Sequence, residues 1–182
     1  MKEKKYMNDW ETSVSLDEKT GRDRRTPVYR GTWSVQSPEG RKTALLLSGA
    51  GCLGFWFCFV LYMLLDFPGT RVLYVFLPLA LAVFPGAYWI MGLYSLARAP
   101  LKMTRVQREK SLGRMRRCAV GAAVFCFVAS VGDLILLFRR GTFDGEGPGF
   151  LLLLAADAVC LLSARAEGLF LRGLEEESPA EA

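Results

Sequence analysis

Long stretches without any charged side chain dominate the pattern of hydrophobic and polar positions in this chain. Residues 43–65 and residues 72–97 are uncharged over 23 and 26 positions. The hydrocarbon core of a bilayer, about 30 Å thick, is crossed by roughly 20 helical residues. Neither stretch shows the polar face that a helix of a soluble protein turns toward water. Both stretches are therefore predicted to be transmembrane helices.

Two further apolar stretches each contain an acidic residue. Residues 118–138 are interrupted only by Asp133, and residues 149–171 contain Asp157 before a more polar end that begins at Arg165. The long side chain of an arginine near a helix end can reach the headgroup region. The sequence therefore predicts an all-α membrane protein with four transmembrane helices.

Short connections limit how these helices can be arranged. Residues 66–71 form a tight turn with a Pro-Gly pair, and the loop 139–148 is short and rich in glycine. Helices joined by such short loops pack antiparallel. We therefore expect a transmembrane domain of residues 43–171 built from two antiparallel hairpins, which the linker 98–117 joins.

Polar segments flank this domain. Residues 1–42 are too polar to bury a core, and we expect a mostly flexible cytoplasmic arm. Within the arm, residues 28–35 alternate imperfectly between β-formers and other types. They could form a short hairpin, contact the membrane surface through their aromatic side chains, or stay unordered. The tail 172–182 is acidic and is expected to be frayed.

The distribution of lysine and arginine predicts the orientation in the membrane. Residues 1–42 hold ten, residues 98–117 hold eight and the chain after residue 164 holds two, whereas the turn 66–71 and the loop 139–148 together hold three. Cytoplasmic connections carry the excess of basic residues. We expect a protein of the cell membrane with both termini in the cytoplasm. The first apolar stretch begins too late for a cleavable signal peptide, so the first helix should be retained.

Aromatic residues near the ends of the first two helices agree with this orientation. Tyr62 and Tyr74 flank the outer turn. Tyr88, Trp89 and Tyr94 lie near the inner end of the second helix. Because such side chains gather at membrane–water interfaces, we expect all five in interfacial belts.

Composition narrows the possible functions. Apolar residues make up 52% of the chain and histidine is absent, which removes the commonest general base and zinc ligand. Five cysteines lie in apolar stretches without CxxC spacing and are interpreted as small core residues. The net charge of +5 comes from the connections, so no specific nucleic acid partner is predicted. We predict no catalytic residues, metal site or cofactor, and we do not expect an enzyme.

Glycine and proline patterns are interpreted here as structural. Residues 49–54 match the dinucleotide-binding pattern GxGxxG, but that pattern functions between a strand and a helix. Inside a membrane helix, small residues let a second helix approach closely. Pro78 and Pro85 interrupt the second helix and are expected to bend it. A transporter-like break at these prolines is the less favoured interpretation.

Two acidic residues inside the predicted spans form the main candidate site. An ionisable group in the bilayer core costs on the order of a few kcal/mol and is by default a functional hypothesis. If Asp133 and Asp157 lie on facing stripes of small residues, they could hold a proton or a cation, with Ser130 nearby. The small residues are Ala119, Ala122, Cys126 and Ala129 on the third helix, and Ala156, Cys160, Ala164 and Gly168 on the fourth.

Structural roles for the same residues remain open. Asp133 could reach water or Arg140, and Asp157 could stay protonated and form a hydrogen bond with Ser130 or with a backbone carbonyl. Asp157 could instead form an ion pair with a basic helix of a partner protein.

The linker 98–117 is a second candidate. It contains eight basic residues and one acidic residue, with apolar residues between them, and could form a short surface helix that begins at Pro100. Such a cluster attracts anionic lipid or an acidic partner, although the orientation signal alone would explain it. The candidate contact residues are Lys102, Arg105, Arg108, Lys110, Arg114, Arg116 and Arg117.

These patterns favour a non-catalytic accessory or scaffold subunit in the lipid bilayer. It would associate through its small-residue helix faces and its basic linker, with itself or with another membrane protein. The alternative is a small oligomeric transporter or ion pathway that uses Asp133 and Asp157.

Overall fold

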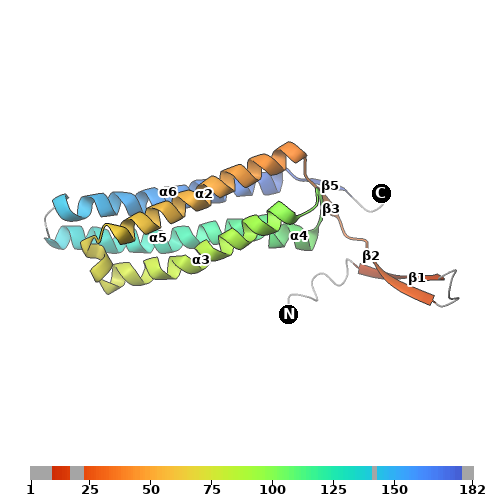
Figure 1. Ribbon diagram of the computed structural model, residues 1–182, viewed down its shortest axis with the longest axis horizontal. Coiled ribbons are helices and arrows are strands. Elements are labelled where there is room, and N and C mark those ends of the chain that lie inside the picture. The colour runs from red at the N-terminus through yellow and green to blue at the C-terminus, as the bar shows by residue number, and fades with distance from the viewer. Residues whose placement is uncertain (1–9, 17–22, 141–142, 178–182) are drawn as a thin grey trace.

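The computed structural model describes residues 10–16, 23–140 and 143–177. Within these residues, four long helices lie side by side in a bundle (Figure 1), and each is long and apolar enough to cross a membrane. The prediction of four helices with the length and apolar composition of membrane spans is thereby confirmed. The helices are α2 (Pro38–Leu64), α3 (Leu73–Arg98), α5 (Leu112–Arg140) and α6 (Phe143–Arg172).

The helices extend beyond the apolar stretches that predicted them. α2 begins at Pro38 because Ser37 caps it, its side chain accepting a hydrogen bond from the backbone N–H of Gly40 at 3.0 Å. α6 begins at Phe143 rather than at residue 149, so most of the predicted loop 139–148 is helical. Hydropathy detects only the apolar part of a helix, and the polar turns at its ends are missed.

Neighbouring helices follow the order α2, α3, α5, α6 around the bundle. The most extensive contacts join α5 to α6 and α3 to α5, while α2 packs mainly on α6 and touches α3 less. A 3-10 turn, η1 (Pro68–Arg71), connects α2 to α3. Before this turn, Asp66 has a φ of 45°, in the left-handed region that Asp tolerates better than most residues.

Small residues bring the helices together inside the bundle. The stripe residues Ala119, Ala122 and Cys126 of α5 are fully buried. In α2, Gly51 lies against Ser163 of α6, and a methyl group at Gly51 would come within 1.9 Å of Ser163 Oγ. The glycine pattern at residues 49–54 therefore includes a close helix contact, as its interpretation as a packing motif requires.

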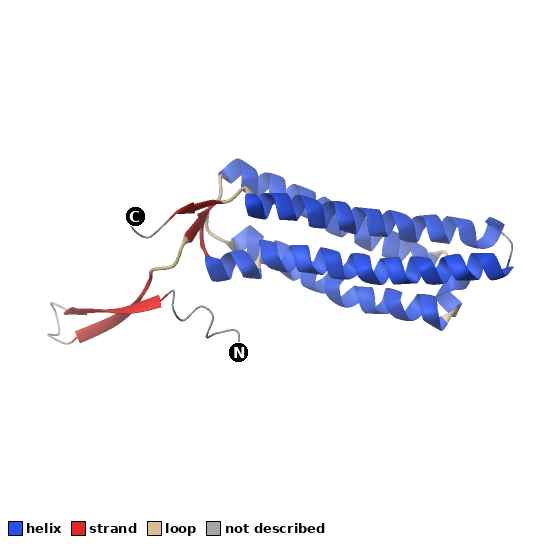
Figure 2. Ribbon diagram, turned by 180° about the vertical axis from the view of Figure 1, so that it is seen from behind, coloured by secondary structure: helices blue, strands red, loops and turns tan. Residues whose placement is uncertain are grey.

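A three-stranded sheet closes one end of the bundle (Figure 2). Its strands are β3 (Trp33–Val35), β4 (Lys102–Thr104) and β5 (Glu175–Glu177), with β3 in the middle and antiparallel to both neighbours. The sheet thus joins the segment before α2, the linker after α3 and the segment after α6. The tail was expected to be frayed, but part of it is the strand β5. Residues 178–182 lie outside the described part of the chain.

The amino-terminal arm also contains strands. β1 (Trp10–Leu16) and β2 (Asp23–Tyr29) pair antiparallel, with Trp10 opposite Tyr29. The expectation of a mostly flexible arm therefore differs from the structure at these residues. Residues 28–35 do not form a hairpin of their own, since β2 pairs with β1 while β3 belongs to the other sheet. Tyr29 and Trp33 meet edge to face, with ring centroids 4.9 Å apart.

The linker after α3 differs from the surface helix predicted to begin at Pro100. It runs first through β4 and then through the short helix α4 (Arg105–Lys110). α4 begins at residue 105 because Thr104 and Gln107 form a capping box, in which each side chain bonds the other's backbone N–H. α5 follows at Leu112, so the last basic residues of the linker belong to a membrane-spanning helix.

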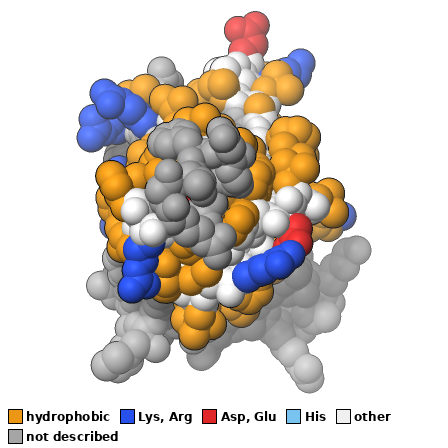
Figure 3. All heavy atoms as spheres, turned by 90° about the vertical axis from the view of Figure 1, so that its left-hand side faces the viewer, with side chains coloured by type: hydrophobic (Ala, Val, Ile, Leu, Met, Phe, Trp, Pro, Cys, Tyr) orange, Lys and Arg blue, Asp and Glu red, His pale blue; other side chains and the backbone are white. Residues whose placement is uncertain are grey.

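Figure 3 shows the end of the bundle opposite the sheet. Hydrophobic side chains cover most of the visible, described surface, with isolated charged groups between them. Exposed apolar residues such as Leu64, Leu73 and Phe138 belong to the ends of α2, α3 and α5. The described surface at this end of the bundle is therefore mostly apolar.

Candidate functional site

A buried acidic residue lies between the helices near the end closed by the sheet. Glu167 of α6 is fully buried, and its Oε1 accepts a hydrogen bond from the indole N–H of Trp89 in α3 at 3.1 Å. Its Oε2 has no hydrogen-bond partner among the described residues. Ser48 of α2 and Arg116 of α5 lie close enough to Glu167 to interact with it. The other three long helices, α2, α3 and α5, thus each contribute a polar group around Glu167.

The environment of Trp89 corrects one prediction from the sequence. Trp89 was expected in an interfacial belt, but its side chain is fully buried. Tyr62, expected in the outer belt, is also fully buried. Tyr74, Tyr88 and Tyr94 are exposed, as a belt requires. Distance from the membrane surface can be estimated from the sequence, but the direction in which a side chain points around the helix axis depends on packing.

Asp133 occupies a second buried polar position, at the other end of the bundle. Its side chain is 1% exposed, and its Oδ1 accepts a hydrogen bond from the Tyr62 hydroxyl at 3.4 Å. Gly69 of η1 leaves room for this pair, because a methyl group there would lie 2.3 Å from the Tyr62 oxygen and 2.5 Å from Asp133 Oδ1. Asp133 therefore joins α5 to α2 and to the turn that follows α2.

Asp157 faces outward, into a groove between α5 and α6. The groove has a volume of about 290 Å³, and among the residues that the structure describes Asp157 is the only charged one that lines it. Its Oδ1 is buried and makes no hydrogen bond to the described residues. Asp157 lies ten residues from the start and 15 from the end of the apolar span Gly147–Arg172, near its middle. The apolar lining consists of Val120, Ala123, Val124, Phe127 and Leu161.

The structure does not bring Asp133 and Asp157 to one site. The side chains of Cys126 and Cys160 interact across the α5–α6 interface, which fixes the register of the two helices. From this contact, Asp133 lies about 6 Å farther along the bundle axis than Asp157. Asp133 points toward Tyr62, whereas Asp157 lines the outer groove. Ser130, the third candidate, donates its hydroxyl to the carbonyl oxygen of Cys126 in its own helix at 2.9 Å.

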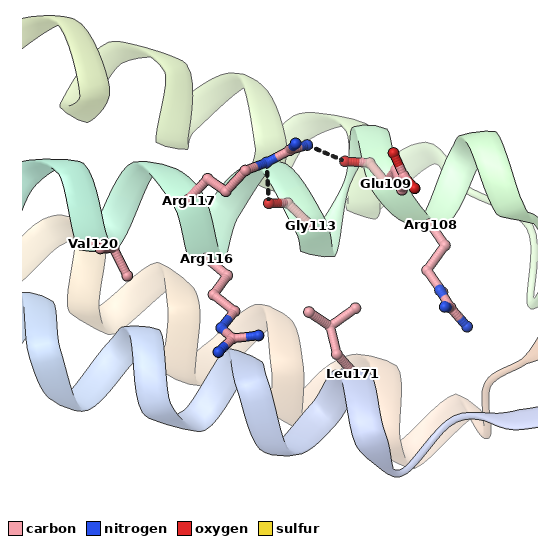
Figure 4. A pocket seen from close by; sticks show the side chains of 7 residues that line it. All are labelled: Arg108, Glu109, Gly113, Arg116, Arg117, Val120 and Leu171. Carbon is pink, nitrogen blue, oxygen red and sulfur yellow. Dashed lines mark hydrogen bonds between the residues drawn. The ribbon is translucent and has the colours of Figure 1, made fainter. Parts of the chain in front are cut away.

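Three of the basic candidate residues line an open pocket of about 590 Å³ between α5 and α6, near the sheet (Figure 4). They are Arg108, Arg116 and Arg117. Arg117 is held by its own helix, since Nε donates to the carbonyl oxygen of Gly113 at 3.0 Å and Nη2 to that of Glu109 at 3.4 Å. Arg108 donates from Nη1 to Ser34 Oγ at 3.1 Å.

The other basic candidates lie around this end of the bundle. Lys102 sits over the Trp33 ring, 5.6 Å from its centroid, and the backbone N–H of Arg105 donates to the Tyr29 hydroxyl at 3.2 Å. Lys110 is exposed and Arg114 is half-buried. Neither Lys110 nor Arg114 lines the pocket that contains Arg108, Arg116 and Arg117.

Within the described ranges, no group of three His, Cys, Asp or Glu residues lies close enough together to bind a metal ion. All five cysteines are free thiols. Four are buried and Cys118 is half-buried, in agreement with their interpretation as small core residues.

Comparisons with protein-family models, curated proteins and solved structures find no match to this chain.

Glu167 is the polar position that the sequence analysis missed. It lies in a predicted helix end, where an acidic residue is unremarkable. The signal was its spacing, because the buried positions of α6 recur every three or four residues and include Glu167. Asp157 stands one position away from this row. The row consists of Leu153, Ala156, Cys160, Ser163 and Glu167.

Proposed function

We propose that this protein is a non-catalytic accessory or scaffold subunit of the cell membrane that joins a partner membrane protein through the outer groove between α5 and α6. The partner supplies a transmembrane helix with a hydrogen-bond donor or a positive charge opposite Asp157. The observation that carries the proposal is the place of Asp157, near the middle of an apolar span and in an outward-facing groove.

The energetics of Asp157 support this proposal. A carboxyl group facing lipid is costly, and such residues usually face a bundle interior or a partner. Within the described residues, the buried Oδ1 has no hydrogen-bond partner. A donor on a second helix would satisfy that oxygen and fill the apolar groove beside it.

The burial of the small residues on α5 and α6 limits the surface at which a partner could dock. The stripes on α5 and α6 are used within the bundle, where Ala119, Cys126 and Cys160 are fully buried. We therefore assign the docking surface to the Asp157 groove instead of to the small-residue faces proposed from the sequence.

We further propose that the four helices form two antiparallel hairpins with both termini in the cytoplasm. The excess of lysine and arginine in the arm, the linker and the tail supports this orientation. The sheet of β3, β4 and β5 supports it independently, because it joins these three segments at one end of the bundle.

The proton or cation pathway is the alternative function. The separate environments of Asp133 and Asp157 do not favour a shared site within one copy of the chain. An oligomer that encloses Asp157 would still allow a pathway, and the experiment below separates it from docking.

In-membrane photo-crosslinking tests the docking proposal. A photoreactive amino acid at Leu161, in the groove, should give a discrete protein adduct, whereas one at Leu81, exposed on α3, should not. Asp157→Leu should abolish the Leu161 adduct, and equal adducts with and without this substitution would rule docking out. Loss of cation or proton flux in proteoliposomes of Asp157→Asn, with the adduct retained, would support the pathway instead.

A further inference from the structure

We propose that the pocket lined by Arg108, Arg116 and Arg117 binds the headgroup of an anionic phospholipid from the leaflet on the sheet side of the bundle. This inference is independent of the partner proposed for Asp157, since it concerns different side chains nearer the end of the bundle. It names one occupant, a phospholipid whose headgroup is a phosphodiester with a net negative charge.

The charge of the pocket matches that occupant. Three arginines line it against one acidic residue, Glu109. Figure 4 shows Arg116 extending from α5 toward α6, with Arg108 of α4 on the far side of Leu171, whereas Arg117 turns toward the carbonyl oxygens of Glu109 and Gly113. The Arg116 guanidinium therefore faces the pocket, and its planar donor fork suits the oxygens of a phosphate.

Arg116 is placed to be the main contact. Its guanidinium lies over Gly168 of α6, and a methyl group at Gly168 would be 3.4 Å from Arg116 Nε. The Arg116 side chain is exposed, Figure 4 marks no hydrogen bond between it and the other lining residues, and the buried Glu167 carboxyl is close enough to interact with it. Because the Arg116 side chain is exposed, a phosphate can reach its outer donors, while Arg108 and Arg117 form hydrogen bonds of their own at the two sides of the pocket.

The lining of the pocket favours a lipid over a free phosphate. Val120 and Leu171 contribute apolar surface beside the arginines. Val120 also lines the apolar groove on the same face of α5, so the charged pocket passes directly into membrane-facing surface. A ligand with a negative headgroup and an attached acyl chain can use both parts at once.

Native mass spectrometry of the full-length protein in detergent tests this site. The added probes are phosphatidylglycerol and phosphatidylcholine with identical acyl chains. Wild type should bind phosphatidylglycerol more tightly than phosphatidylcholine. Arg116→Gln should weaken phosphatidylglycerol binding about fivefold and leave phosphatidylcholine binding unchanged.

Arg98→Gln is the matched control. It removes the same charge at the same end of the bundle, from an exposed side chain that lies over the Tyr94 ring outside the pocket. This variant should bind phosphatidylglycerol as wild type does. Equal weakening by Arg98→Gln and Arg116→Gln would overturn the proposal, because it would indicate a diffuse positive surface rather than a site.

Competition distinguishes a lipid from a soluble phosphate. Glycerol 3-phosphate carries the anionic group without acyl chains and should not displace phosphatidylglycerol at equal concentration. Displacement at equal concentration would overturn the assignment to a lipid. Neither result depends on Asp157, so failure of this site and failure of the proposed docking groove can be told apart.

Discussion

The indole N–H of Trp89 donates a hydrogen bond to Oε1 of Glu167 at 3.1 Å, and both side chains are fully buried. This bond ties α3 to α6 across the bundle. It is also the one hydrogen bond that the structure gives the Glu167 carboxyl, since Oε2 has no partner in the described residues. The stability of this end of the bundle should therefore depend on Trp89.

Trp89→Phe should destabilise the protein by about 1–3 kcal/mol, because it removes the indole donor from a buried carboxyl. Thermal unfolding in detergent, followed by circular dichroism, measures the change. Trp56→Phe is the matched control, since the Trp56 indole N–H is buried and has no hydrogen-bond partner in the described part of the chain. If the two substitutions lowered the unfolding temperature equally, the hydrogen bond to Glu167 would not be the cause.

The number of membrane-spanning helices was predictable because insertion depends mainly on the composition of each segment. The rotation of each helix was harder to predict, as Trp89 and Glu167 show. Trp89 was assigned to a membrane interface from its distance along the helix, and Glu167 was given no role, whereas packing turns both side chains into the core. The spacing of the buried positions along α6 includes Glu167. Hydropathy marks only Asp157, because Asp157 interrupts an uncharged stretch whereas Glu167 lies in a more polar helix end.

The sheet was beyond prediction for a different reason. β3, β4 and β5 are each three residues long, too short to show a period of two. They also pair segments that are far apart in the sequence, such as Ser34 with Met103 and Ser34 with Glu176. The strands form because the helices bring these segments together, so local sequence contains little of the information.

Gly51 and Gly49 should respond oppositely to substitution by alanine. Gly51→Ala should destabilise the protein, because the new methyl group would come within 1.9 Å of Ser163 Oγ. Gly49→Ala should be neutral or stabilise by up to about 1 kcal/mol, since nothing lies within 4 Å of the position and alanine favours helix.

A double substitution checks the cause of the Gly51 effect. Ser163→Ala removes the oxygen that a methyl group at Gly51 would strike, but it leaves Ser163 Cβ at 2.9 Å from that methyl group. The double variant should therefore recover part of the unfolding temperature lost in Gly51→Ala. Strict additivity of the two substitutions would contradict a direct contact between α2 and α6 at this point.

Glu176→Pro should open the sheet on one side. Proline has no backbone N–H, so β5 would lose its pairing with Ser34 of β3. Hydrogen exchange at the amides of β3 should speed up, while exchange within α5 and α6 stays unchanged. Unchanged protection of β3 in Glu176→Pro would show that β5 does not hold this segment in place.

The Asp66–Arg71 pair lies outside the long helices and makes a pH-dependent contribution to the stability of the folded protein. Arg71 Nη2 donates to Asp66 Oδ2, and this bond, together with the positive charge, lowers the pKa of the carboxyl from its ordinary value of 3.8. The stabilisation by this pair is complete at a pH above the ordinary pKa of Asp66. It is lost as the pH falls through the lower pKa that Asp66 has in the folded protein. Because both side chains are exposed, the effect at neutral pH should be small.

Asp66→Asn should remove this acid-dependent contribution while keeping a residue that tolerates the left-handed backbone at position 66. The unfolding temperature in detergent, measured from neutral pH to below pH 3.8, should fall less steeply in the variant than in wild type. Arg71→Gln should flatten the profile in the same way, because it removes the group that lowers the pKa of Asp66. A variant profile that superimposes on that of wild type would show that the Asp66–Arg71 pair does not contribute to acid sensitivity.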